Sequence, residues 1–285
     1  MNKVYNVAGI TLTVDYLYPD LLEKSLEQYI TSEEANYHIR VSLIDHFDIP
    51  KTEPSIIYKN RFIYELEEES IYVIYDKTLT RISHVITYQN EGKDISLYLM
   101  KSSTKNLVEL EYLLTGIFFY EIALKEGFII LHASAVKQGE EVYLFSSPSG
   151  GGKSTMAELF LKEYPESTIL NDDKPIIKQR GNEFYVYGTP WSGKTQTNMN
   201  DEGHLHSIIF LKQAPFNQVS PLSPRLKIEQ MYRNMFRPRE EAENVKVATM
   251  VEKCIARTRI IQYEFINHPS AAQYIYKWIK KEQIK

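Results

Sequence analysis

The segment that most constrains the fold is a glycine-rich run, Ser147-Pro-Ser-Gly-Gly-Gly-Lys-Ser154. It lies between an apolar stretch typical of a strand, Val142–Phe145, and a helical pattern over Lys153–Tyr164. Glycines adopt positive φ and let backbone N–H groups approach phosphate oxygens, while a helix start presents its positive dipole end to the same anion. The run matches the nucleotide loop G-x-x-x-x-G-K-[ST] except that Ser147 holds the first glycine position. It therefore predicts a nucleotide-phosphate site; the alternative is a glycine-rich turn without a ligand.

In such a loop the lysine and the hydroxyl residue have separate roles. We expect Lys153 to reach the β- and γ-phosphates of ATP and the Ser154 hydroxyl to bind Mg²⁺. The residues expected to contact the nucleotide are Ser149, Gly150, Gly151, Gly152, Lys153, Ser154 and Thr155. ATP and Mg²⁺ are thus the predicted cofactors.

Two adjacent carboxylates follow the next apolar run. Asp172 and Asp173 come directly after the predicted strand Thr168–Leu170, and we expect that strand to deliver them to the edge where a parallel sheet gathers its ligands. One carboxylate can hold a metal, and the other can accept a proton from an incoming hydroxyl. Paired aspartates are also common in turns. Upstream, His132 closes the predicted strand Phe128–Leu131, where a histidine is either packed or catalytic.

The chain divides into two regions by composition. Residues 1–104 are β-rich, with short alternating runs, and residues 105–285 alternate strands and helices, beginning with a buried helix over 106–125. The first region is expected to form strands over 4–14, 38–44, 62–66, 71–75, 82–88 and 95–99. The second is expected to form strands over 128–131, 142–145, 168–170, 184–187, 207–211 and 260–265, with helices over 153–164, 228–236, 242–254 and 271–281. The predicted class is α/β in the second region and α+β overall.

Composition excludes several classes of protein. The 33 basic and 37 acidic residues give a net charge of -4, which provides no electrostatic footprint for nucleic acid or anionic membranes. We expect no membrane span and no signal peptide, because the apolar runs are short or interrupted by charges. Cys254 is the single cysteine, so no internal disulfide or cysteine-based zinc site can form. A cytoplasmic protein is the expectation.

Four further patterns have both a functional and a structural interpretation. The loop Gly188–Lys194 can cover the nucleotide, with Lys194 on the transferring phosphate and Trp191 as a lid, or it can be a turn with a packed Trp. His204 and His206 suggest a metal site, but a solvated loop is favoured. Thirteen of the 21 tyrosines precede residue 121 and form either a binding face or sheet packing, which is favoured. A basic tract can bind an acidic peptide or form a solvated helix face, which is favoured; it comprises Arg225, Lys227, Arg233, Arg237 and Arg239.

Three segments together resemble the catalytic domain of the HPr kinase/phosphorylase family. They are Leu131-His-Ala-Ser-Ala-Val136, Ser147-Pro-Ser-Gly-Gly-Gly-Lys-Ser154 and Leu170-Asn-Asp-Asp-Lys174, and the resemblance covers residues 127–215. It implies a P-loop catalytic fold related to phosphoenolpyruvate carboxykinase. It also implies roles: His132 assists at the phosphoryl site, Lys153 and Ser154 hold MgATP, Asp172 is the general base, Asp173 supports the metal, and Ser149 is the loop serine.

The sequence departs from that family in two places. The hallmark segment E-[IV]-R-G-[IL]-G is replaced by Tyr187–Lys194, and residues 1–100 do not resemble the family's regulatory domain. The chain is more similar to shorter HPr-kinase-like proteins of ribosomal peptide biosynthesis, some of which phosphorylate a serine of a precursor peptide. The resemblance therefore implies a serine kinase acting on a peptide or small protein, and it suggests an oligomer. The alternatives are an HPr kinase that regulates carbon uptake and a nucleotide-binding module without catalysis.

Overall fold

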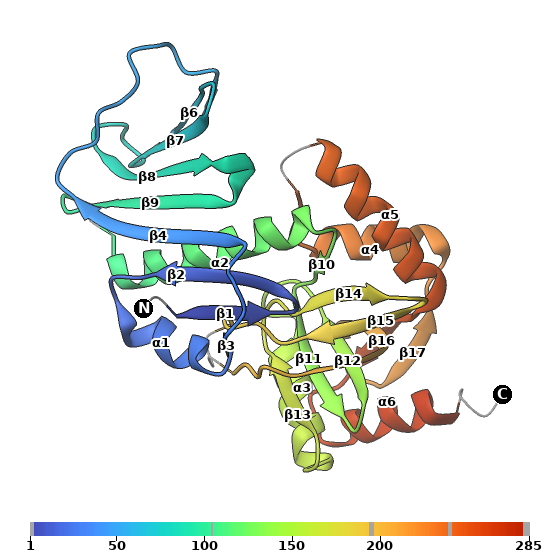
Figure 1. The fold of residues 1–285 in the computed structure, drawn as a ribbon. Coiled ribbons are helices and arrows are strands. Elements are labelled where there is room, and N and C mark those ends of the chain that lie inside the picture. Colours follow the sequence, from blue (N-terminus) through green and yellow to red (C-terminus); the bar gives the residue numbers. More distant parts are fainter. Residues whose placement is uncertain (1–2, 104, 194–196, 239–240, 282–285) are drawn as a thin grey trace. The chain divides into compact units, whose positions relative to one another are not determined.

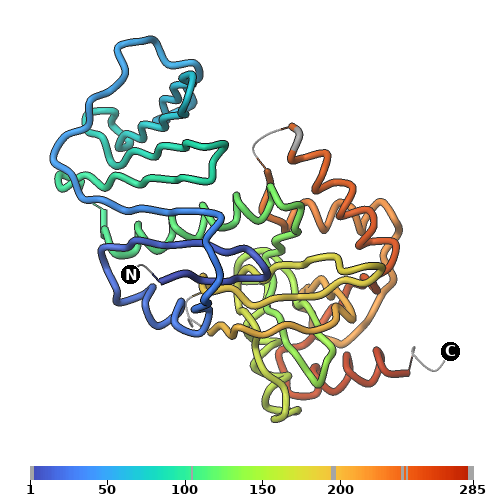
Figure 2. Tube along the Cα trace, viewed as in Figure 1, coloured from blue at the N-terminus to red at the C-terminus, as the bar shows by residue number. Residues whose placement is uncertain are grey.

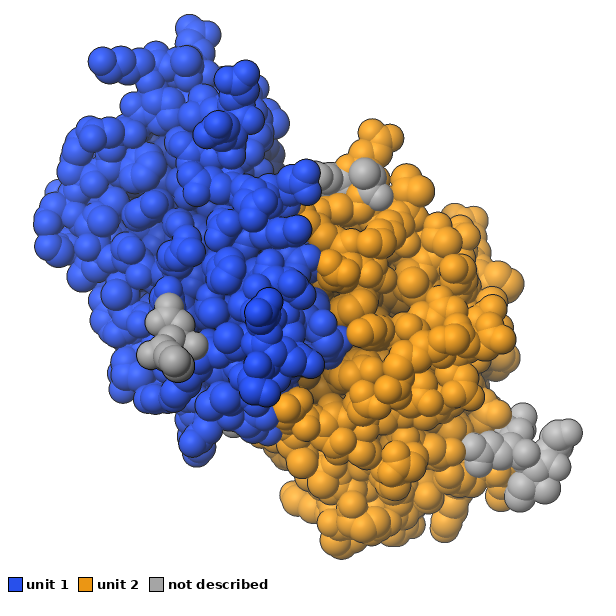
Figure 3. Space-filling model, viewed as in Figure 1, with its two compact units in different colours: residues 1–122 blue, residues 123–285 orange. Residues whose placement is uncertain are grey.

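The chain forms two compact units, residues 1–122 and 123–285, which Figure 3 shows in different colours. The computed structural model describes residues 3–103, 105–193, 197–238 and 241–281. Over these residues each unit contains a nine-stranded sheet, and the chain has six α-helices, so the predicted α+β class is confirmed (Figure 1). The division between the units follows residue 122, whereas the composition change lies near residue 104, so the long helix between these positions belongs mostly to the first unit.

The first unit is a mixed sheet with two α-helices among its described residues. The strands are β1 (Val4–Val7), β2 (Ile10–Asp15), β3 (Ile30–Thr31), β4 (Tyr37–Ile44), β5 (Ile56–Tyr58), β6 (Arg61–Glu65), β7 (Glu69–Tyr75), β8 (Ile82–Gln89) and β9 (Asp94–Met100); the helices are α1 (Pro19–Glu27) and α2 (Leu107–Lys125), with a 3₁₀ turn at Asn90–Gly92. Their order in the sheet is β3-β1-β2-β4-β9-β8-β7-β6-β5. The predicted first strand is two strands joined by a turn at Ala8 and Gly9, both with positive φ. Helix α1 was not predicted from the sequence.

Two carboxylates on α2 tie this helix to the rest of the first unit. The fully buried Glu111 accepts hydrogen bonds from the backbone N–H groups of Leu17 and Tyr18, at 2.6 and 2.9 Å, just before α1. One turn from the end of α2, Glu121 accepts a hydrogen bond of 2.8 Å from the hydroxyl of Tyr88 on β8. Both carboxylates therefore have a structural role in positioning α2.

The tyrosines of the first unit are mostly buried or half-buried. Of the thirteen before residue 121, all described by the structure, only Tyr58 on β5 is exposed. Tyr5, Tyr29 and Tyr64 belong to the core. Packing within the unit, on the sheet and on α2, is therefore favoured over an exposed binding face.

The second unit has the remaining strands and four helices within its described part. The strands are β10 (Ile129–Ile130), β11 (Ala133–Gln138), β12 (Glu141–Ser146), β13 (Thr168–Asn171), β14 (Ile176–Arg180), β15 (Glu183–Tyr187), β16 (Glu202–Gln213), β17 (Gln218–Pro221) and β18 (Arg259–Phe265); the helices are α3 (Lys153–Glu163), α4 (Pro224–Asn234), α5 (Glu241–Arg257) and α6 (Ser270–Lys281). The sheet order is β10-β14-β15-β16-β12-β11-β13, with β18 also paired to β16 and β17. All six strands and all four helices predicted here are present, while β11, β14 and β17 were not predicted (Figures 1 and 2).

The strand before the acid pair is not part of a parallel sheet, and this expectation is wrong. β13 lies at an edge and pairs antiparallel with β11, which pairs antiparallel with β12 on its other side. Because β11 runs against both neighbours, its start lies between their ends: Ala133 pairs with Ser146 of β12, and Ala135 pairs with Asn171 of β13. The three segments that carry His132, the glycine-rich loop and the acid pair therefore meet at one end of the sheet.

The core beneath this end of the sheet is aromatic and aliphatic. Helices α3 and α6 contribute Phe160 and Ile275, which belong to one buried cluster with Phe145 and Tyr263 from the sheet. Among the helices that the structure describes, none is both long enough and apolar enough to span a membrane.

Candidate active site

The glycine-rich loop opens onto the start of α3. Residues 148–150 are exposed, and Gly150 and Gly152 have φ of 78° and 100°, in the left-handed region. A Cβ on Gly152 would lie 2.6 Å from the ring of Phe265, so this position requires glycine for space as well as for conformation. The loop therefore has the left-handed backbone that the nucleotide-loop interpretation needs.

The start of α3 has no side-chain cap among the described residues. Gly152 precedes the helix, no described side chain caps the first turn, and that turn contains no acidic residue. Lys153, the first residue of the helix, is buried and donates a hydrogen bond of 2.9 Å to the carbonyl oxygen of Ser147. Burial lowers the pKa of Lys153, the charge of Asp173 opposes this shift, and Lys174 adds to it. A buried ammonium beside free helix N–H groups is suited to an anion.

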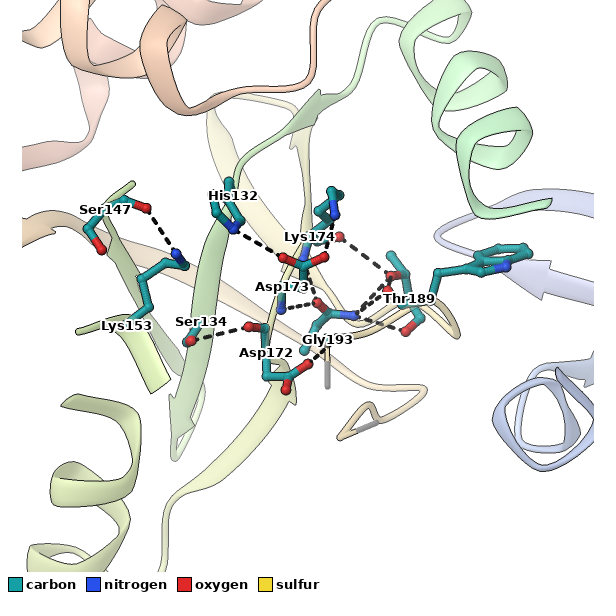
Figure 4. A network of polar contacts seen from close by, with 11 residues as sticks. His132, Ser134, Ser147, Lys153, Asp172, Asp173, Lys174, Thr189 and Gly193 are labelled. Carbon is teal, nitrogen blue, oxygen red and sulfur yellow. Dashed lines mark hydrogen bonds and ion pairs between the residues drawn. The ribbon is translucent and has the colours of Figure 1, made fainter. Parts of the chain in front are cut away.

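Asp173 contacts both His132 and Lys174 through its carboxylate, at the start of β11. Its carboxylate lies 3.2 Å from Nε2 of His132 and forms an ion pair with Lys174 (Figure 4). Its carbonyl oxygen also accepts a hydrogen bond of 2.9 Å from the N–H of Ala133, which fixes the acid pair against β11. Burial raises the pKa of Asp173, but the hydrogen bonds and charges of His132 and Lys174 outweigh it and lower the pKa to about 2.

Asp172 points to a different partner from its neighbour. Its side chain is buried and accepts a hydrogen bond of 2.7 Å from the N–H of Gly193, and Figure 4 shows the two carboxylates directed apart. The hydroxyl of Ser134 on β11 donates to the Asp172 carbonyl at 3.4 Å. The two carboxylates thus have different described partners: Asp173 pairs with His132 and Lys174, and Asp172 is bonded to the loop that follows β15.

Asn171 is a residue of this site that we did not predict. Its Oδ1 accepts hydrogen bonds from the backbone N–H groups of Asp173 and Lys174, at 2.9 and 2.7 Å. Its Nδ2 donates to the carbonyl oxygens of Thr189 and Trp191, at 3.0 and 3.1 Å. Asn171 is fully buried and therefore joins the acid-pair turn to the 189–193 loop. The sequence signal for this role was that a polar residue, Asn171, directly follows the predicted apolar strand Thr168–Leu170.

The donor set of the site fits Mg²⁺ bound together with a nucleotide. No group of three histidine, cysteine or acidic residues is gathered in the described part of the chain, so a metal cage made of protein alone is not seen there. Ser154 is exposed at the start of α3, and Asp173 supplies one carboxylate. Mg²⁺ is commonly held by one or two protein oxygens together with substrate phosphates and water, and these residues match that pattern.

The other candidate residues have mixed outcomes. Lys194 lies outside the described residues. Trp191 is only 3% exposed, which favours the packed turn over a lid. His204 and His206 lie on β16, so the expected solvated loop is wrong; His206 packs against Tyr143, with ring centroids 5.1 Å apart.

Most of the basic tract lies on or next to α4. Arg225 and Lys227 are on the helix, and Arg233 pairs with Glu229 at 2.7 Å. Arg237 follows the helix and donates to the carbonyl of Tyr232, while Arg239 lies outside the described residues. The positions of most of these residues therefore agree with a solvated helix face, which was the favoured interpretation.

The site combines an uncapped helix start, a buried lysine and two carboxylates with different described partners. Such an arrangement can hold a phosphorylated ligand, bind a metal ion and accept a proton. No family model matches the sequence, and no curated protein sequence matches it either.

Proposed function

We propose that this chain is an ATP- and Mg²⁺-dependent kinase that phosphorylates a serine hydroxyl on a peptide or small protein. The observation that supports this most directly is the uncapped start of α3, where Gly152 is left-handed and the buried Lys153 is coupled by charge to Asp173. A triphosphate there would meet backbone N–H groups and an ammonium. A glycine-rich turn without a ligand would not need a buried lysine at that point.

The two carboxylates suit different roles. A pKa of about 2 makes Asp173 a weak base but leaves it ionised, which suits a metal ligand. Asp172 accepts a hydrogen bond from the N–H of Gly193, and the resemblance of the Leu170–Lys174 segment to the HPr kinase/phosphorylase family implies that it is the general base. Ser154 and Asp173 would hold Mg²⁺, which would supply charge neutralisation of the phosphates.

In the proposed phosphate transfer, each of these residues has one role. The serine oxygen attacks the γ-phosphorus, the bond from that phosphorus to the bridging oxygen breaks, and ADP leaves. The hydroxyl proton passes to Asp172. Lys153 offsets charge on the phosphates, and His132, 3.2 Å from Asp173, holds that carboxylate in place.

The test is incubation with Mg²⁺ and ATP labelled in the γ-phosphate, with mass spectrometry of the acceptors. One arm contains a pool of flexible serine peptides, and the second contains folded HPr. We expect label on serine in the peptide arm and little label on HPr. Efficient labelling of HPr with inert peptides would favour the carbon-uptake regulator, and ATP binding with no transfer in either arm would favour the binding module. Asp172→Asn is the control for transfer by another enzyme in the preparation.

A further inference from the structure

A cavity of about 300 Å³ opens beside His132, on the side of α4. It is lined by His132, Lys174, Arg233, Asn234, Met235 and Phe236, all in the second unit. None of these residues belongs to the glycine-rich loop. The volume is at the lower end of the range for ligand pockets, which suits one side chain better than a whole nucleotide.

The wall of this cavity is held in fixed register with the site. The N–H of His132 donates to the carbonyl of Asn234 at 2.8 Å, and the N–H of Phe236 donates to the carbonyl of Ile130 at 2.9 Å. Leu131 and Met235 form a β-bridge between these bonds. The chain after α4 is therefore paired with the residues that lead into β11, and the cavity is a fixed neighbour of His132.

The charges of the lining residues have one sign. Lys174 and Arg233 are cationic, and no carboxylate is among the residues that line the cavity. The partner of Lys174 is Asp173, within the site, and the partner of Arg233 is Glu229, one turn earlier on α4. Both members of the Arg233–Glu229 pair are about half exposed, and such surface pairs exchange readily for another anion. Met235 and Phe236 supply an apolar surface for the stem of a ligand.

We propose that this cavity binds the carboxylate of an aspartate or glutamate in the acceptor peptide, close in sequence to the serine that receives the phosphate. Arg233 makes the main contact through its guanidinium, which pairs well with carboxylates. The pocket thereby sets the sequence preference of the acceptor. This proposal rests on the proposed kinase function.

The test measures binding separately from transfer. The immobilised full chain, loaded with Mg²⁺ and a non-hydrolysable ATP analogue, is equilibrated with a library of serine peptides whose neighbouring positions are randomised. All peptides are amidated at the C-terminus, so that side chains supply the carboxylates, and the retained peptides are sequenced by mass spectrometry. We expect aspartate or glutamate to be enriched at one or two positions near the serine, by about ten-fold, the lower end of the effect of one charge-assisted hydrogen bond.

Two variants make the test specific. Arg233→Gln should abolish the enrichment, whereas Arg225→Gln, which removes the same charge from an exposed position of α4 outside the cavity, should keep it. Absence of acidic enrichment, or enrichment that survives Arg233→Gln, overturns the proposal. The same retained peptides are then offered Mg²⁺ and ATP: Arg233-dependent enrichment without phosphate transfer would support the pocket and refute the kinase function.

Discussion

Both units bury titratable groups, but they use them differently. In the first unit, Glu111 accepts two backbone N–H groups ahead of α1, and His84 is buried on β8 beside Ser83. In the second unit, Lys153 and Asp172 are buried, Asp173 is half-buried, and Lys153 and Asp173 are coupled by charge beside an uncapped helix start. The buried groups of the first unit hold elements of the fold together, whereas those of the second unit place charge beside the candidate ligand site.

This difference between the two units leads to an expectation about variants that experiments can test. Variants at Lys153, Asp172 and Asp173 should change ligand binding or chemistry with little change in stability. Variants at Glu111 and His84 should change stability and leave the chemistry intact. The four predictions below run from the largest expected effect to the smallest.

The largest effect is expected for Asp172→Asn. Asparagine keeps the size of the side chain and can still accept the Gly193 hydrogen bond, but it cannot take a proton. Phosphate transfer should fall by roughly 10²–10⁴, with MgATP affinity within a few-fold of wild type. Single-turnover transfer and calorimetry measure the two quantities. Full activity in this variant, with loss in Asp173→Asn, would move the base role to Asp173.

His84 should make the stability of the first unit depend on pH. Burial, with the charges of Lys105 and Arg61, lowers its pKa from 6.5 to about 4. The unfolded chain then binds a proton before the folded chain does, so the contribution of His84 to the free energy of unfolding is fully present above pH 6.5 and is lost as pH drops towards 4. The loss should reach about 3 kcal/mol. Urea unfolding at several pH values measures it, and His84→Asn should flatten the curve without changing transfer at pH 7. An equal slope in both proteins would contradict this.

Lys153→Ala should weaken MgATP binding by about 30-fold, the usual effect of losing a charge-assisted hydrogen bond. Its thermal stability should be unchanged or higher, because the substitution removes a buried charge whose pKa is lowered by burial. Calorimetry and thermal unfolding check both statements. Lys162→Ala, which removes a charge from the exposed far end of the same helix, should leave affinity unaltered. Equal affinities in Lys153→Ala and wild type would remove the phosphate role of the loop.

The smallest effect is expected for Glu111→Gln. The amide replaces one accepting oxygen with a donor, so one of the two N–H groups before α1 loses its partner. Stability should fall by about 1 kcal/mol, with transfer unaffected. Chemical denaturation tests this, with Glu109→Gln, an exposed residue of the same helix, as the matched control. A loss of transfer larger than the loss of stability would break the distinction between the two units.

The sequence indicated the loop, the acid pair and His132 as candidate site residues, but not how the chain brings them together. The alternation and helical spacing were enough to place the strand before the loop and α3. β11 was not predicted, because Ala133-Ser-Ala-Val-Lys-Gln138 has small residues and little β-branched character, yet this strand brings His132 between the loop and the acid pair. Asn171 was missed for a related reason: its role depends on contacts with Thr189 and Trp191, which are distant in sequence.

The central claim is that a triphosphate binds at the start of α3, and glycine amides report on it most directly. The chain has only 12 glycines, so a sample labelled with ¹⁵N at glycine gives a simple spectrum. On titration with MgATP, we predict that the signals of Gly150, Gly151 and Gly152 shift together, while those of Gly9 and Gly92 in the first unit do not move. Unchanged loop signals at saturating MgATP, or shifts confined to the first unit, would contradict the account.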